Sequence, residues 1–495
     1  MTVEREPAAM SVRGAAAWAM GAQYVGFALQ FATSVIISRF FLNPAEVGLF
    51  SIALAAALLV AVLQDFGLSR YIAGLPVIDP AEVERCSTVA LLFSFVVAGV
   101  IAASAWPLAA LYGHPELAPI LLIIAGSYLA LPLAVVPMAM MARSMQFRGH
   151  AIVTVGGTVA QCGVGIALAW AGQSSFALAW ATLAAGLARG GIAQALRPSP
   201  PWPLRFDSVR TVLSFGSRSS TLYLTGGLGT RTPDLIVGKL LGLTAVGLYS
   251  RAVGLSDQFR QLIAGAMGSV FYPAFARIRD RGEPLGPPYL RVCAGYSAII
   301  WPGMAGLALA AEPLVRILYG DEWMGVAPLL TMIALTEILL VALPLVSELP
   351  IVLGRLNSLL AYNIADTALS ITLLALGCLW GVEGAAASRL VYGALWLCLY
   401  WRFFHGLVRF DAGALARIYA KSAAATVAAI APLALTYLVW EPPARLEFGP
   451  LLVAVVLGGV AWLVTLVTLR HPAVGEITTM ARELPILRRH LRPAL

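Results

Sequence analysis

The chain has 495 residues, of which 60% are hydrophobic and only 12% are charged, and its mean hydropathy is +0.84. Soluble globular proteins carry about 25% charged residues, so this composition excludes an ordinary soluble enzyme and indicates a protein that crosses a membrane several times. The formal net charge of +8 would suit a nucleic-acid partner, but the placement of the basic residues favours another explanation.

Long apolar segments follow one another along almost the whole chain. A helix needs about 20 apolar residues to span a bilayer, and alternating strands of the kind that form membrane barrels are absent from the pattern. The first segment is too long for a cleaved signal peptide, so we expect an uncleaved first helix. The sequence predicts an all-α polytopic membrane protein with about fourteen transmembrane helices, at 14–39, 47–70, 87–110, 117–141, 150–171, 176–195, 211–240, 245–276, 289–312, 324–350, 356–380, 382–404, 419–440 and 449–469.

The basic residues are unevenly divided between the two sides of the predicted membrane. With the amino terminus in the cytoplasm, only Arg39, Lys239, Arg316 and Arg445 fall in outside loops, and five arginines lie within helices, which leaves 24 of the 33 Lys and Arg on the cytoplasmic side. Such an excess is the positive-inside bias that orients membrane proteins. We therefore expect both termini in the cytoplasm and no nucleic-acid partner.

Three sequence motifs occur twice in the same order. "LNPAEVGLFS" at 42–51 is repeated as "LGLTAVGLYS" at 241–250, "LYGHPELAPILLIIA" at 111–125 as "LYGDEWMGVAPLLTMIA" at 318–334, and "LPLAVVP" at 131–137 as "LPLVSELP" at 343–350. Each repeat unit then contains six helices, and an even number of helices gives both units the same orientation. This arrangement is typical of transporters whose substrate path lies between two related halves.

The predicted organisation is therefore two parallel six-helix repeats followed by two further helices. The expected segments are an N-terminal lobe at 1–196, a Pro- and Arg-rich cytoplasmic linker at 197–210, a C-terminal lobe at 211–404, a linker at 405–418, helices 13 and 14 at 419–469, and a basic cytoplasmic tail at 470–495.

No motif for soluble-type catalysis is found. The chain lacks HExxH, an Asp-x-Asp pair, Gly-x-Ser-x-Gly and a complete phosphate-binding loop. Its five cysteines are scattered singly, which suits neither zinc nor a redox pair and predicts small buried hydrophobic residues instead. We predict no catalytic residues and no metal site.

The charged residues within the predicted helices are the candidates for function, because such residues are costly in hydrocarbon unless paired or hydrated. Arg231 and Asp234, and likewise Asp257 and Arg260, are three residues apart, so each pair can be neutralised on one helical face. Glu337 and Glu348 are eleven apart and are expected on one face of a single helix, where they could bind a coupling cation or proton, or pair with Arg389. Arg218 and Arg251 have no local carboxylate, so we expect them to contact an anionic ligand.

The candidate site residues fall into two groups. Those expected to bind a pyrophosphate or sugar are Arg218, Arg251, Arg231, Arg260 and Tyr223. Those expected to couple an ion or form ion pairs are Asp234, Asp257, Glu337, Glu348, Asp366 and Asp65.

Four stretches resemble a known family over about residues 14–470. "SRFFLNPAEVGLFSIALAAALLVAVLQDFGLSRYI", "PDLIVGKLLGLTAVGLYSRAVGL", "VFYPAFARI" and "LVRILYGDEWMGVAPLLTMIAL" are similar to the O-antigen and exopolysaccharide flippases of the multidrug/oligosaccharidyl-lipid/polysaccharide exporter superfamily. Asp234 and Lys239 occupy the acidic and basic positions of the family pattern D-L-x-x-G-K/R.

The resemblance implies a two-lobed twelve-helix core, a central cationic cavity and two extra helices. The implied function is the alternating-access transfer of undecaprenyl-pyrophosphate-linked oligosaccharide across the bacterial inner membrane for lipopolysaccharide or exopolysaccharide synthesis. The implied partners are membrane lipids, a polysaccharide polymerase and other assembly proteins, with no cofactor beyond a Na⁺ or H⁺ gradient.

Four alternatives remain open at this point. A peptidoglycan-precursor flippase usually carries extra arginines in its first helix, and this chain has none between Arg13 and Arg39. A cation-coupled multidrug exporter would want a cavity of net negative charge. A membrane glycan polymerase or ligase would want a long periplasmic loop, and a non-transporting scaffold for glycan assembly has no sequence signature that distinguishes it.

Overall fold

The computed structural model describes residues 12–61, 68, 71–72, 75, 78–199, 204–205, 227–264 and 275–475. Within these ranges the protein is helical and contains no strand. The chain divides into two compact units, residues 1–250 and 251–495, with the boundary inside helix α10.

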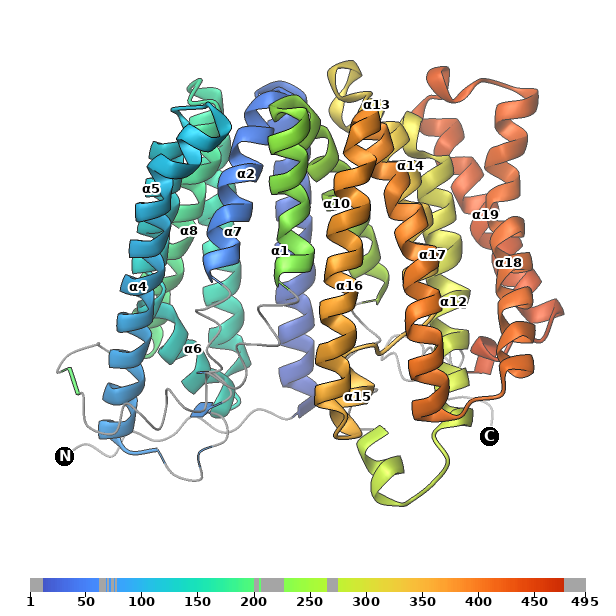
Figure 1. Cartoon of the computed structure of the whole chain (residues 1–495), viewed down its shortest axis with the longest axis horizontal. Helices are drawn as coiled ribbons and strands as arrows, with labels where there is room; N and C mark the ends of the chain where they lie inside the picture. The colour runs from blue at the N-terminus through green and yellow to red at the C-terminus, as the bar shows by residue number, and fades with distance from the viewer. Residues whose placement is uncertain are drawn as a thin grey trace, which may run out of the picture. The chain divides into compact units, whose positions relative to one another are not determined.

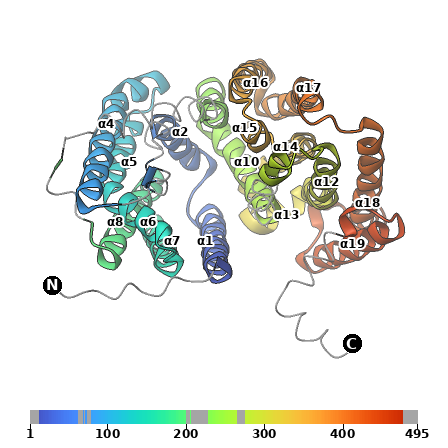
Figure 2. The same ribbon diagram turned by 90° about the horizontal axis from the view of Figure 1, so that it is seen from below.

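The first unit is a bundle of long helices with a short helical run before α10 (Figures 1 and 2). Its helices are α1 (Val12–Phe40), α2 (Pro44–Ala61), α4 (Pro80–Tyr112), α5 (Leu117–Leu129), α6 (Pro132–Arg143), α7 (Phe147–Trp170), α8 (Ser175–Leu196), residues 227–241 and the first part of α10 (Leu243–Ala264).

The second unit begins within α10 and ends with the two additional helices. It comprises the rest of α10, residues 275–280, α12 (Gly286–Leu309), α13 (Ala311–Tyr319), η2 (Asp321–Trp323), α14 (Val326–Leu340), α15 (Glu348–Val352), α16 (Leu356–Gly377), η3 (Cys378–Trp380), α17 (Gly381–Val408), α18 (Ala412–Val439), η4 (Pro443–Arg445) and α19 (Phe448–Thr468).

Local sequence signals explain where several helices begin and end. Asn43 and Glu46 cap α2 reciprocally, since each backbone N–H donates to the other's side chain at 2.9 and 3.0 Å. Asp79 caps α4 by accepting from the Glu82 N–H at 2.6 Å, and α4 ends at Gly113, whose φ of 75° is readily adopted only by glycine.

The predicted span 117–141 is broken. α5 and α6 are bent by 42° relative to each other, and Pro132 opens α6 because proline cannot continue the hydrogen bonding of the preceding helix. The predicted span 324–350 is also divided, since α14 ends at Leu340 and α15 begins only at Glu348.

The helices are apolar enough for a membrane protein. Nine described helical segments are long and apolar enough to cross a bilayer, or ten if the bent pair α5–α6 forms one span. One of these segments runs over residues 356–408, but Gly381 adopts a φ of 80° there and α16 packs against α17, so two helices are present. The protein is therefore an all-helical, multi-pass membrane protein, as the sequence predicts.

Candidate functional site

Charged side chains from α10 and α14 meet in the second unit. Arg260 Nη2 lies 2.8 Å from Asp257 Oδ1 one turn earlier on α10, and Arg260 Nε lies 3.2 Å from Glu337 Oε2 on α14. The pairing of Asp257 with Arg260 predicted from their spacing is present. Glu337 pairs with Arg260, and no ion pair joins it to Arg389 among the residues that the structure describes.

A second polar group joins α16 and α17. Arg389 Nη1 donates to Ser370 Oγ at 2.8 Å, and its guanidinium lies 4.5 Å from the centre of the Tyr392 ring. The Tyr392 hydroxyl donates to Asp366 Oδ1 at 2.9 Å. Asp366 is therefore held by a tyrosine, and Arg389 is held by a serine and an aromatic face.

The prediction that Glu337 and Glu348 share one face of a single helix is wrong. Seven residues of non-helical or turn structure separate α14 from α15, and Leu345 adopts a φ of 62° within them. Pro344 explains the break, because its ring removes a backbone donor and disfavours helical geometry at the preceding residue. Glu348 opens α15 and belongs to a different element.

Arg251 is partly buried and lies against aromatic rings. Its guanidinium carbon lies 5.5 Å from the centre of the Tyr319 ring and 5.3 Å from that of Trp323, and both of these side chains are almost fully buried. Such stacking is a favourable setting for a desolvated guanidinium. A direct contact between Arg251 and a ligand would require this stack to open.

In the first unit, Asp234 and Arg231 do not form the ion pair that their spacing predicts. Asp234 Oδ1 instead accepts a hydrogen bond from Ser250 Oγ at 3.5 Å. Arg231 is exposed, and no hydrogen bond or ion pair of its side chain is found within the described ranges. Lys239 donates to the Leu111 carbonyl at 2.6 Å, so it caps the end of α4.

Three candidates lie outside the described residues. These are Arg218 and Tyr223 in the segment 206–226, and Asp65 in the segment 62–67.

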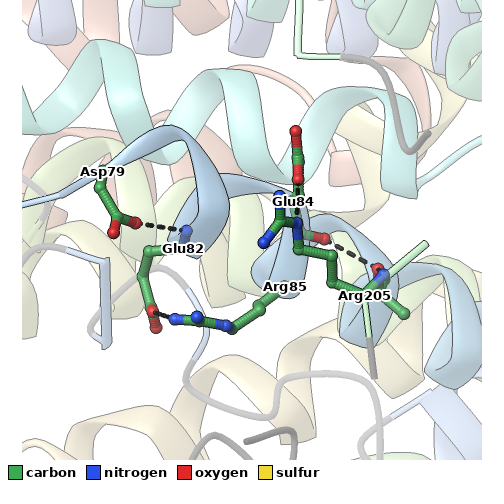
Figure 3. A network of polar contacts seen from close by, with 6 residues as sticks. Asp79, Glu82, Glu84, Arg85 and Arg205 are labelled. Carbon is green, nitrogen blue, oxygen red and sulfur yellow. Dashed lines mark hydrogen bonds and ion pairs between the residues drawn. The ribbon is translucent and has the colours of Figure 1, made fainter. Parts of the chain in front are cut away.

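A polar network at the start of α4 was not predicted. The Glu82 carboxylate contacts Arg85 at 2.5 Å and accepts from the Tyr71 hydroxyl at 2.8 Å. The side chain of Arg205, from the expected linker, pairs with Glu84 (Figure 3). The backbone N–H of Arg205 also donates to the buried Thr88 hydroxyl at 3.0 Å, so this point of the linker is fixed to α4.

Arg189 of α8 is a second residue that sequence reasoning missed. Its side chain lies over Gly157 of α7, where a Cβ atom would come within 2.2 Å of it, and its buried Nε has no hydrogen-bond partner in the described part of the chain. The sequence feature that could have identified Arg189 is its position inside an apolar segment, seven residues before the end of α8.

The described site is not strongly cationic. In the second unit, the three arginines 251, 260 and 389 are equal in number to the carboxylates 257, 337 and 366, and Glu348 is a fourth carboxylate. Arg231 of the first unit is exposed and has no carboxylate partner within the described ranges. No group of three or more His, Cys, Asp or Glu side chains in these ranges could hold a metal ion.

The four buried cysteines agree with the prediction from their spacing. Cys86, Cys162, Cys293 and Cys378 are buried free thiols, whereas Cys398 on α17 is exposed. The expectation of buried hydrophobic cysteines is therefore correct for four positions and wrong for Cys398.

The fold places the chain in a known structural class. It resembles the inward closed conformation of the lipid II flippase MurJ with a TM-score of 0.73, over 91% of this chain and 98% of that one, at 14% identity. At this identity the likeness establishes the fold alone.

Sequence comparison then identifies the family. The model of the polysaccharide biosynthesis protein family matches residues 36–328, more than half of the chain, and the chain belongs to this family. It is 26% identical to the succinoglycan biosynthesis transport protein ExoT of Rhizobium meliloti over 65% of each chain. It is 22% identical to the lipopolysaccharide biosynthesis protein WzxC of Escherichia coli over 73% of this chain and 74% of that one. The match to the first relative thus spans slightly less than two thirds of that protein.

Proposed function

We propose that this protein is a transporter that moves an undecaprenyl-pyrophosphate-linked oligosaccharide from the inner to the outer leaflet of the bacterial inner membrane. It acts by alternating access, without covalent catalysis, in the synthesis of a surface polysaccharide. The family, the flippase-like fold and the names of the two sequence relatives support this class of substrate.

Arg231 is the observation that carries the proposal. It lies ten residues before residue 241, the last in its helix, which places it about 15 Å from that end at 1.5 Å per residue. This depth is near the middle of a hydrocarbon core about 30 Å thick. An exposed arginine costs about 2.5–3.5 kcal/mol there unless water and an anion reach it.

A pyrophosphate would satisfy this arginine. The planar guanidinium donates two parallel hydrogen bonds to phosphate oxygens, which lysine does not reproduce. Arg218, thirteen residues earlier, and Tyr223 are proposed to serve the same ligand. Arg260 and Arg251 are proposed to stabilise the second unit through their pairing and stacking.

The proposed energy source is a Na⁺ or H⁺ gradient. Candidate carboxylates are Asp234, whose contact is with a serine, and Glu337, which shares Arg260 with Asp257. Both termini are proposed to be cytoplasmic, and a polysaccharide polymerase is the proposed partner that receives the exported unit.

The test is surface glycan export in a strain that lacks the native gene, with immunoblotting to measure protein amount. Arg231→Ala is expected to abolish export at normal protein level, and Arg231→Lys is expected to restore it only in part. Arg355→Ala is the matched control, because Arg355 is an exposed arginine at the start of α16. Normal export by Arg231→Ala would overturn the assignment of this residue to the pyrophosphate.

A further inference from the structure

Two glycines that correspond to each other in the sequence repeat are in direct contact in the first unit. A Cβ atom on Gly48 of α2 would lie 1.9 Å from the Leu243 carbonyl oxygen, and a Cβ atom on Gly247 of α10 would lie 1.8 Å from the Pro44 carbonyl oxygen. Real Cβ atoms essentially never come within 3.0 Å of another heavy atom in this way. Both positions therefore require glycine while the two helices remain at this separation.

The contact is reciprocal because of the repeat. Pro44 and Leu243, and likewise Gly48 and Gly247, occupy the same places in the two copies of the motif, "LNPAEVGLFS" at 42–51 and "LGLTAVGLYS" at 241–250. Each glycine faces the carbonyl at the start of the other helix, so a local two-fold axis passes between α2 and α10 at their first turns.

The contact is tight but weak. A carbon–carbon bond is about 1.5 Å long, so the Gly48 Cα lies at most about 3.4 Å from the Leu243 oxygen. This separation is typical of Cα–H···O contacts, which are weaker than ordinary hydrogen bonds. Two helix amino termini also carry like partial charges, which opposes their approach.

Water is excluded from the crossing. Gly48 and Gly247 are both buried, and the preceding Val47 and Val246 are 5% and 0% exposed. Small residues allow helix backbones to approach this closely in membranes, where packing replaces the hydrophobic effect as the driving force. The crossing is thus dry and is held by no side-chain hydrogen bond between the two glycine positions.

We propose that the Gly48–Gly247 crossing is the reversible seal that closes the outer side of the transport path. The inference rests on the proposed transport function and on the outward orientation that the division of basic residues predicts for these helix starts. A tight, dry contact between backbones blocks passage in one state, and its weakness lets the same helices separate when the path opens outward. The glycines are positioning residues, since they act through the separation of the helices and not on the substrate.

The experiment measures an opening distance in purified, full-length protein. Spin labels are placed by Glu116→Cys and Glu322→Cys, at exposed positions in the two repeated outer loops, in a Cys398→Ser background because the other four thiols are buried. Gly48→Ala and Gly247→Ala must each move the added Cβ by at least 1.1 Å to reach 3.0 Å from the opposing oxygen. We expect each variant to shift the distance distribution toward longer values and to reduce export about tenfold.

Gly254→Ala is the matched control, because Gly254 lies on the same helix as Gly247 and a Cβ atom there meets nothing within 4 Å. It is expected to leave both the distances and export unchanged. An unchanged distance distribution in Gly48→Ala and Gly247→Ala would overturn the proposal. Loss of both proteins, with Gly254→Ala stable, would also overturn it, since the crossing would then be permanent packing. The distance between the spin labels is measured without glycan. If the variants lengthen this distance but the protein proves to transport another substrate, only the proposed function is refuted and the proposed seal stands.

Discussion

Arg260 of α10 binds Glu337 of α14 across 3.2 Å, while the same guanidinium holds Asp257 at 2.8 Å. Arg260 is therefore the link between two carboxylates on two helices. Its side chain is 35% exposed and that of Glu337 is 16% exposed, so the pair is partly screened by solvent.

Removal of Arg260 is expected to destabilise the second unit. Arg260→Ala leaves Glu337 without its cation, and an unsatisfied buried group costs about 1–3 kcal/mol. We expect a lower melting temperature in detergent for Arg260→Ala than for Arg260→Ala combined with Glu337→Gln, because the double variant removes the stranded charge. Equal melting temperatures would contradict this, because the Glu337 carboxylate left without Arg260 would then have no measurable cost.

Glu337 and Glu348 are expected to behave differently in ion coupling. Glu337→Gln removes a carboxylate within the charged group, whereas Glu348→Gln changes the first residue of the separate helix α15. If a cation gradient drives transport, Glu337→Gln slows export at normal protein level and Glu348→Gln does so less. Wild-type export rates in the double variant would exclude coupling through either carboxylate.

Arg251 is expected to contribute to stability through its aromatic partners. Loss of a desolvated cation–π contact costs about 2 kcal/mol, so Arg251→Ala should lower the amount of folded protein, and Arg251→Lys should restore it in part. Fluorescence-detected size-exclusion chromatography measures this directly. Full abundance with abolished export would instead assign Arg251 to the ligand.

The orientation of the chain is testable with reporter fusions. Fusions after residues 205, 285 and 412 are expected to report the cytoplasm, and fusions after 114, 320 and 443 are expected to report the periplasm, because of the uneven division of basic residues. A periplasmic signal at 205 or 285 would contradict the parallel orientation of the two repeats.

A buried histidine, His471, stabilises the residues that directly follow α19. The Nδ1 atom of His471 accepts from the Ala473 N–H at 3.1 Å, so its proton is on Nε2, 3.0 Å from the Ser422 oxygen. The Ser422 hydroxyl lies 2.8 Å from that of Ser297 on α12, which donates to the Cys293 carbonyl at 2.7 Å. Burial, together with the nearby Lys421 ammonium, lowers the pKa of His471.

This arrangement predicts a loss of stability in acid. A histidine whose pKa is lowered by folding contributes stability that is present above the unfolded value of about 6.5 and is lost as the pH falls toward the folded value. The slope from one such group is at most about 1.4 kcal/mol per pH unit. We expect the fall in melting temperature between pH 7.5 and pH 5.5 to be smaller in His471→Gln, and an equal fall in both proteins would contradict this role.

Several features could be predicted from the sequence because they depend on local chemistry. Hydrophobic runs of sufficient length become helices in a bilayer wherever they occur, so all fourteen predicted segments contain described helical residues. The pairing of Asp257 with Arg260 depends only on their separation by one helical turn, so it could be predicted from the sequence as well. The repeat identified Gly48 and Gly247 as equivalent residues.

The contacts between elements were decided only by tertiary structure. Spacing placed Asp234 on the same helical face as Arg231, but the packing of α10 gave Asp234 a serine as its partner instead. Spacing could not place Tyr319 and Trp323 around Arg251, since these residues are about seventy positions away in the chain.

The sequence by itself therefore determined the class of protein, its helices and the equivalence of the two glycines. Tertiary structure decided which charges are paired, and it brought the two glycines into contact. The physical reason is the separation along the chain of the residues that interact. Hydrophobic partition and helix formation are set by neighbouring residues, whereas ion pairs and close backbone contacts between helices depend on the positions of whole helices. The separation of at most about 3.4 Å between the Gly48 Cα and the Leu243 oxygen is decided by packing, and no local pattern in the chain specifies it.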